Sequence, residues 1–166
     1  MTIQTKQIWE WLADVPDPEI PVISIVDLGI VREVTMRDGI CEVTITPTYS
    51  GCPAMLVISE SVINTLRNRG VQAVLKMQIS PAWTTDWMSE SGKQKLKAYG
   101  IAPPQFQAID ISRLTTRSRD QVQPKVPCPR CHAQATVCIS QFGSTPCKAL
   151  YRCQSCLETF DYFKCH

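Results

Sequence analysis

Apolar and polar residues follow two different periods along the first hundred residues. Near the N-terminus, Ile8, Leu12 and Val15 recur at helical spacing and predict a first helix. Residues 29–37 and 40–46 instead alternate between apolar and polar side chains, which is typical of β-strands. The pattern therefore predicts a helix followed by two neighbouring strands.

The second half of this region carries equally clear signals. Asp38-Gly39 lies between the two strands and is typical of a tight hairpin turn. A helical period then returns, and its apolar positions predict one buried face; these positions are Met55, Ile58, Val62 and Leu66. Residues 71–79 predict a third strand, and residues 87–99 predict an amphipathic helix that stops at Gly100.

The pattern changes after residue 100. Residues 101–125 begin with a proline pair and continue as a polar run without an apolar period, so we interpret them as a linker. Within residues 126–166, the segments 135–142 and 150–152 are strand-like. We predict an α+β protein with a small α/β domain over residues 1–100 (helix, β-hairpin, helix, strand, helix), the linker, and a zinc-ribbon-like domain over residues 126–166.

Composition narrows the class of protein. Hydrophobic residues make up 44% and charged residues 19% of the 166 residues, as in globular proteins. Residues 1–100 hold nine Lys and Arg against eleven Asp and Glu, whereas residues 101–166 hold eight against four. This asymmetry is too small to indicate nucleic-acid binding by itself. We see no secretory signal and no apolar stretch of membrane-spanning length, so we expect a cytoplasmic protein.

The nine cysteines are then expected to be metal ligands, reactive thiols or core residues rather than disulfides. Four of them form two C-x-x-C pairs, Cys128 with Cys131 and Cys153 with Cys156, separated by 21 residues. Each C-x-x-C turn directs two thiolates to one point, and two such turns complete a tetrahedron. Because some forty residues bury little core, a metal would supply folding energy. We predict that these four cysteines bind one zinc ion.

The remaining cysteines leave a second assignment open. Cys147, Cys153, Cys156 and Cys165 form an alternative set whose first spacing is close to that of plant-type iron–sulfur proteins. Cys147 and Cys165 are therefore candidate additional ligands, and an iron–sulfur cluster is the alternative to zinc. The paired C-x-x-C spacing favours zinc.

A second candidate site lies in the first domain. Cys52 follows Gly51 and precedes Pro53, which suits the first turn of a helix, so the helix end is expected to favour the Cys52 thiolate. Asp17 and Glu19 lie in a segment stiffened by prolines and could complete a site for iron or another divalent metal. The alternatives are a cysteine buried under a turn and two carboxylates that cap a helix or face solvent.

Motifs of a conventional catalytic centre are missing from the sequence. It contains no Ser-His-Asp set, no phosphate-binding glycine loop and no H-E-x-x-H motif, and it has only two histidines. We therefore expect no independent catalysis from this chain.

Several motifs together resemble known families. Residues 17–21, 27–31 and 46–53 resemble the SUF-associated family of small iron–sulfur assembly domains, a likeness that covers residues 5–100. Three further segments resemble the narrower family of D subunits of bacterial phenylacetyl-CoA epoxidase; they are residues 81–88, 142–153 and 160–165. The resemblance implies an assembly-type domain with a zinc-ribbon-like tail, and it makes Cys52 the functional thiol, with Asp17 and Glu19 as neighbours.

The resemblance also implies a role in aerobic phenylacetate degradation. The epoxidase is a multicomponent oxygenase with a di-iron subunit and a reductase, and these would be the partners of a D subunit that matures the complex. Our first hypothesis is therefore a maturation factor that holds iron or an iron–sulfur cluster transiently at Cys52. The second is an electron-transfer component with an iron–sulfur cluster in the C-terminal cysteines. The third, a zinc ribbon that binds nucleic acid, is disfavoured by the modest charge.

Overall fold

The computed structural model describes residues 4–49, 51–104 and 126–164. These residues form two compact units, of which the first extends to Tyr99 and the second begins at Gly100. Most of the expected linker, residues 105–125, lies outside the described residues, so the domain bounds taken from the sequence stay a prediction. Both helices and strands are present, which confirms the predicted α+β class.

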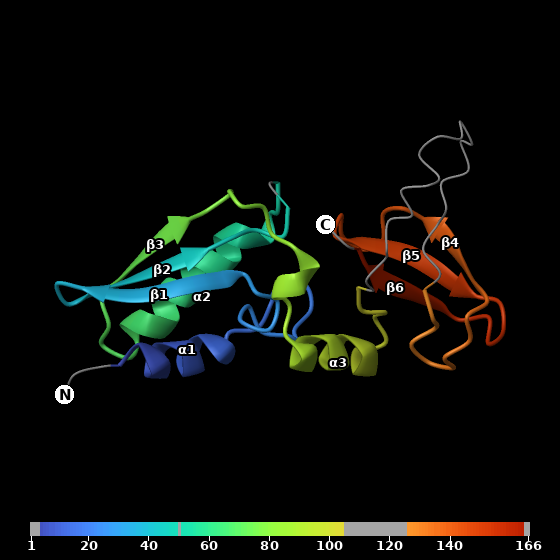
Figure 1. The fold of residues 1–166 in the computed structure, drawn as a ribbon, viewed down its shortest axis with the longest axis horizontal. Coiled ribbons are helices and arrows are strands. Elements are labelled where there is room, and N and C mark those ends of the chain that lie inside the picture. The colour runs from blue at the N-terminus through green and yellow to red at the C-terminus, as the bar shows by residue number, and fades with distance from the viewer. Residues whose placement is uncertain (1–3, 50, 105–125, 165–166) are drawn as a thin grey trace. The chain divides into compact units, whose positions relative to one another are not determined.

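The first unit has the predicted order of helix, hairpin, helix, strand and helix (Figure 1). Its elements are α1 (Thr5–Ala13), β1 (Val31–Arg37), β2 (Ile40–Ile45), α2 (Ala54–Arg67), β3 (Ala73–Met77), the 3-10 helix η1 (Thr85–Trp87) and α3 (Glu90–Tyr99). The strands end one or two residues inside the predicted ranges, as is usual for element boundaries. Within the described residues, no helix has the length and apolar content that a membrane span requires.

The sheet of the first unit has the order β1-β2-β3, with β1 antiparallel and β3 parallel to β2. The hairpin turn has positive φ at both Asp38 (50°) and Gly39 (81°), as a type I′ turn requires. Parallel neighbours need a crossover, and α2 supplies it between β2 and β3. The loop that leads into α2 and the end of β3 consequently lie at the same end of the sheet.

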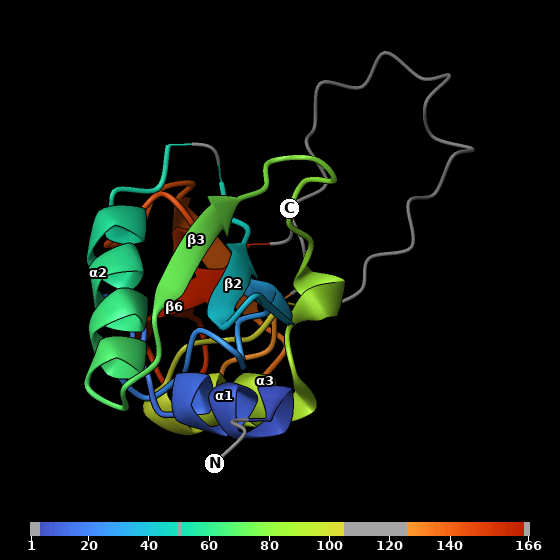
Figure 2. The same cartoon turned by 90° about the vertical axis from the view of Figure 1, so that its left-hand side faces the viewer.

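The core of the first unit lies between the sheet and its helices. Cys41, Val43 and Ile45 of β2 are fully buried, as their alternation predicts. Helix α2 runs along the sheet (Figure 2) and buries every predicted apolar position, namely Met55, Ile58, Val62 and Leu66. Cys41 is therefore a core residue, which leaves Cys52 as the accessible thiol among the described residues of this unit.

The second unit is a three-stranded antiparallel sheet of β4 (Thr136–Ser140), β5 (Lys148–Cys153) and β6 (Thr159–Phe163). The sequence interpretation found the first two strands and missed β6. The core is small, and the Tyr151 ring packs in it against Phe160 and Tyr162, with ring centroids 6.0 and 5.5 Å apart. Few other large side chains are available to hold this unit together.

Candidate functional site

The two C-x-x-C turns bring four sulfur atoms together in the second unit. All four Sγ atoms, from Cys128, Cys131, Cys153 and Cys156, lie within 4.8 Å of one another. The Sγ atoms of Cys128 and Cys156 are 3.8 Å apart, and those of Cys131 and Cys153 are 3.5 Å apart. A tetrahedral zinc ion with Zn–S bonds of about 2.3 Å separates its sulfur ligands by about 3.8 Å. The spacing of the donors therefore fits zinc.

The two turns share one backbone design. In each turn the N–H of the first cysteine donates to the carbonyl five residues later, from Cys128 to Ala133 at 3.0 Å and from Cys153 to Glu158 at 2.9 Å. The fourth residue after that cysteine has positive φ in both turns, 62° and 64°. Neither of these residues is a glycine, so the repeated geometry left no glycine signal in the sequence.

The environment of the sulfurs favours a bound cation. The N–H groups of Cys156 and Ser155 donate to Sγ of Cys153 at 3.5 and 3.4 Å, and they lower the pKa of that thiol to about 6. The N–H of Glu158 lowers the pKa of Cys156, but desolvation and the hydrogen bonds to the other thiols outweigh it and raise the value to about 12. Cys156 thus keeps its proton near neutral pH unless a metal displaces it.

The other C-terminal candidates are placed differently. Cys147 is buried, its Sγ lies 3.0 Å from Oγ1 of Thr145, and it is not part of the four-sulfur group. Cys165 lies outside the described residues. Their role as additional ligands, and the cluster that would use them, stay predictions.

Cys52 lies where the loop after β2 enters α2. The helix begins at Ala54 with Pro53 as its N-cap, so Cys52 stands one residue before the cap. Its side chain is partly exposed, and its backbone N–H donates to the carbonyl of Tyr49 at 3.1 Å. The loop therefore presents one thiol at the end of the sheet.

The pKa of the Cys52 thiol is raised above its ordinary value, chiefly because burial disfavours the thiolate. The N–H of Ala54 and the hydroxyl of Thr48 lower this pKa, whereas the charges of Glu19 and Asp17 raise it. The expected preference of the helix end for the thiolate is thus present, but it does not decide the direction of the shift in pKa. The helix end contributes with the expected sign, but burial is the larger effect.

Residues 17–21, which we call the acidic loop, lie close enough to Cys52 for the charges of Glu19 and Asp17 to raise the pKa of its thiol. Asp17 is buried, and its Oδ1 accepts hydrogen bonds from the N–H groups of Glu19 and Ile20 at 2.9 and 2.8 Å. The thiol and these carboxylates do not form a closed ligand group; in the part of the chain that the structure describes, the four cysteines are the one such group. Sequence reasoning missed Thr48, because a threonine in a loop carries no signal of its own.

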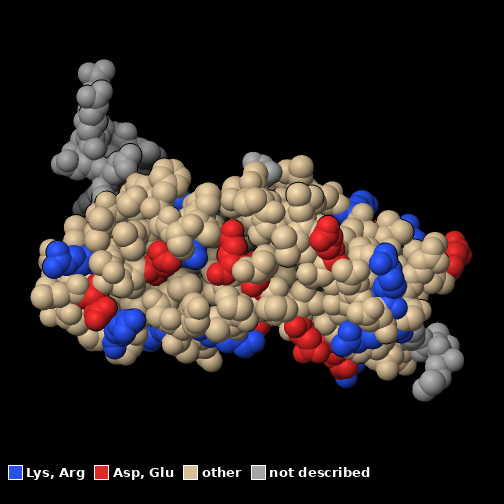
Figure 3. Space-filling model, turned by 180° about the vertical axis from the view of Figure 1, so that it is seen from behind, with Lys and Arg blue, Asp and Glu red and all other residues tan. Residues whose placement is uncertain are grey.

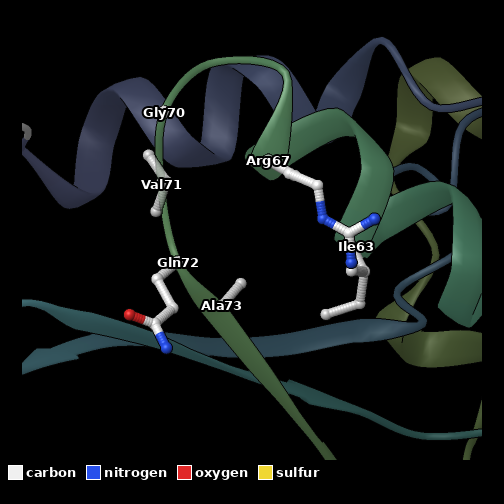
Figure 4. Close-up of a pocket in the computed structure, with 6 residues that line it drawn as sticks. All are labelled: Ile63, Arg67, Gly70, Val71, Gln72 and Ala73. Atoms are coloured by element: carbon white, nitrogen blue, oxygen red, sulfur yellow. The ribbon is translucent and has the colours of Figure 1, made fainter.

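A pocket at the other end of α2 offers no comparable chemistry. Figure 4 shows the residues that line it, which are Ile63, Arg67, Gly70, Val71, Gln72 and Ala73. None of them is a thiol, a carboxylate or an imidazole.

On the face drawn in Figure 3, acidic and basic side chains are interspersed without an extended basic area. This face therefore lacks the clustered basic side chains that are typical of nucleic-acid binding.

Comparison with known proteins separates the two parts of the chain. Residues 5–75 match the family described as iron–sulfur cluster assembly protein, and residues 113–164 match the PaaD zinc beta ribbon domain. A protein of Escherichia coli (strain K12) described as the D subunit of 1,2-phenylacetyl-CoA epoxidase is 47% identical over 165 residues, which are 98% of this chain and 93% of that protein. This chain belongs to that family of D subunits.

Other relatives match about half of the chain. An Fe-S protein maturation auxiliary factor of Porphyromonas gingivalis is 38% identical over 98 residues, 57% of this chain and 92% of that protein. The crystal structure of a DUF59 domain from Bacillus anthracis has a TM-score of 0.52 and 29% identity, and it covers 55% of this chain and 89% of that domain. The family resemblance inferred from the motifs is confirmed, and the four-cysteine cluster lies in a zinc ribbon.

Proposed function

We propose that this protein is a maturation factor of the phenylacetyl-CoA epoxidase, which assists the insertion of iron or an iron–sulfur cluster into another subunit. The name of the Escherichia coli relative supports the epoxidase context. Three relatives that match about half of the chain are named as Fe-S protein maturation auxiliary factors, and they support the kind of task. The client would be the di-iron oxygenase subunit or the reductase, in a complex of several subunits.

One observation carries the proposal, namely the contrast between a closed set of four sulfurs and a partly exposed single thiol. A metal held by four thiolates is retained, and in a unit with so small a core it serves the fold. An ion that must be passed on needs fewer protein ligands and an open side. Cys52, with two carboxylates in reach, meets this requirement. We assign zinc to the ribbon and the transferred iron to Cys52.

The residues around Cys52 also account for how cargo would bind. The free thiol stays protonated, so it does not attract cations indiscriminately. A thiophilic ion displaces the proton, and the same charges of Glu19 and Asp17 that destabilise the free thiolate then attract the bound cation. Binding should therefore release a proton, and protonation should favour release of the ion.

The test compares the two thiols of the first unit. Cys52→Ser should abolish the binding of ferrous iron by anaerobically purified protein, measured by metal analysis, while the zinc content stays unchanged. Cys41→Ser is the matched control, because Cys41 is fully buried and should leave iron binding intact. In cells that lack their own D subunit, Cys52→Ser should also fail to support epoxidase activity. Full epoxidase activity in that variant would refute the role of Cys52.

A visible spectrum of the same protein tests the rival assignment. Zinc is colourless, whereas an iron–sulfur cluster in the C-terminal cysteines would absorb visible light. Stoichiometric iron and sulfide that persist in Cys52→Ser would favour the electron-transfer component over the maturation factor.

A further inference from the structure

A short segment, residues 23–30, is hydrogen-bonded to both sides of the thiol site. At the start of the segment, the carbonyl of Ile23 accepts a hydrogen bond from the N–H of Asp17 at 2.9 Å. At its end, the carbonyl of Ile30 accepts one at 2.8 Å from the N–H of Thr46, where the loop toward Cys52 begins. The separation of the acidic loop from Cys52 therefore depends on the conformation of residues 23–30.

Two tryptophans that follow β3 hold this segment in place. The indole N–H of Trp83, a buried side chain, donates to the carbonyl of Leu28 at 2.9 Å. Gly29, with φ of +70°, lies so close to Trp87 that an added Cβ would stand 2.4 Å from the Trp87 carbonyl oxygen. The guanidinium of Arg32 lies over the Trp87 ring, with Cζ 3.5 Å from the ring centroid.

The carboxylate of Asp27 joins the same segment to α3. It accepts hydrogen bonds from Oγ of Ser89 and Nζ of Lys95, both at 2.6 Å. Burial alone would raise the pKa of Asp27, but the hydrogen bonds from Lys95 and Ser89 outweigh it and hold the pKa below its ordinary value. The ionised carboxylate is thus the form that the fold stabilises. At Gly92, an added Cβ would stand 3.0 Å from the backbone carbonyl of Asp27, so α3 packs closely here.

We propose that Trp83 and Asp27 are positioning residues of the thiol site, because they hold residues 23–30 in the conformation that sets the acidic loop against Cys52. That this positioning serves iron binding rests on the function proposed above. The hydrogen bonds from Trp83, Ser89 and Lys95 to residues 23–30 are independent of that function. Trp83 and the partners of Asp27, Ser89 and Lys95, lie beyond residues 5–75, the part that matches the iron–sulfur assembly family.

The test uses the reactivity of Cys52 in the full chain with zinc in the ribbon. Trp83→Phe removes the indole N–H and keeps an aromatic ring. If the segment loosens, the sulfur gains water and moves away from Glu19 and Asp17, and both changes lower its pKa. The rate of alkylation of Cys52 by iodoacetamide, followed by peptide mass spectrometry across a range of pH, gives the pH profile of this thiol. At neutral pH the rate should become roughly two- to fivefold faster, the upper value corresponding to one lost hydrogen bond.

Two internal controls separate positioning from a general loss of stability. Cys41 is fully buried, so its alkylation reports opening of the whole unit and should stay slow in Trp83→Phe. Trp11→Phe is the matched variant, because the Trp11 ring lies against Arg69, with Cζ 5.2 Å from the ring centroid, and it should leave the pH profile of Cys52 alkylation unchanged. Equal acceleration of Cys41 and Cys52 in Trp83→Phe would overturn the proposal.

Lys95→Gln provides a second, milder variant, because the Lys95 side chain is 46% exposed and tolerates replacement. It should shift the pH profile of Cys52 in the same direction by a smaller factor. An unchanged profile in both variants would overturn the proposal. Neither metal nor client enters this measurement, so it is independent of the maturation role. Failure of the wild-type protein to bind ferrous iron would instead refute the proposed function.

Discussion

The four-cysteine turns and the loop of Cys52 hold sulfur in opposite ways. In the ribbon, four sulfurs converge, and backbone N–H groups lower the pKa of Cys153 to about 6. In the loop, a single sulfur is partly buried near two carboxylates, and its pKa is raised. The first arrangement needs a cation to be stable, and the second is stable as a neutral thiol without one. The number of converging donors therefore distinguishes retention of a metal from its exchange.

The largest expected effect comes from removing one of the four cysteine ligands of the ribbon. Cys128→Ser should unfold the second unit, because structural zinc sites contribute about 10 kcal/mol or more of binding free energy. Zinc analysis and NMR chemical-shift dispersion measure this, and the signals of the first unit should persist. Cys138→Ser is the matched control, since Cys138 lies in the same sheet outside the four-sulfur group. A folded, zinc-loaded Cys128→Ser protein would contradict the ligand set.

The next largest effect concerns the contact of Gly29 with Trp87, which holds residues 23–30 beside the Cys52 site. Gly29→Ala should destabilise the first unit by about 3 kcal/mol, because the new Cβ is strained by positive φ and clashes with Trp87. Gly39→Ala also has positive φ, but it meets no atom within 4 Å, so about 1 kcal/mol is expected. Urea denaturation of both variants gives the difference, which isolates the contact with Trp87. Equal losses would show that this contact contributes nothing.

A smaller effect concerns acid stability. A carboxylate with a depressed pKa stabilises the fold above its unfolded pKa of about 3.9, and the contribution is lost as the pH falls through the lower folded value. Asp27→Asn should therefore lower the unfolding free energy by about 1 kcal/mol at pH 7. It should also flatten the decline of stability below pH 4. Urea midpoints measured from pH 2 to pH 7 test both statements, and a decline as steep as that of the wild type would contradict them.

The smallest effect concerns the loop itself. The hydroxyl of Thr46 is buried without a hydrogen-bond partner among the described residues. Thr46→Val replaces it with a methyl group and should stabilise the first unit by about 0.5 kcal/mol, measured by thermal denaturation. Thr48→Val is the contrasting variant, because Thr48 bonds to Cys52 and lowers its pKa. Thr48→Val should therefore raise the pKa of Cys52 further. A thermal stability of Thr46→Val below that of the wild type would contradict the argument that the buried Thr46 hydroxyl is destabilising.

Local signals in the sequence predicted the elements that depend on neighbouring residues. The hairpin at Asp38-Gly39 and the buried face of α2 follow from turn chemistry and from helical spacing. Strand β6 was missed, because Phe160 and Tyr162 acquire their role by packing against Tyr151 of the adjacent strand. Single-sequence periodicity over five residues is too short to show such packing.

The sequence by itself determined that the four C-terminal sulfurs would converge, because a C-x-x-C turn places two thiols together and the strands between the turns bring the pairs into contact. Only the tertiary structure decided the protonation of Cys52. That property depends on burial and on Asp17 and Glu19, more than thirty residues away in sequence, whose field opposes the helix end. Spacing fixes local geometry, whereas desolvation and charge reflect everything that the fold places around an atom.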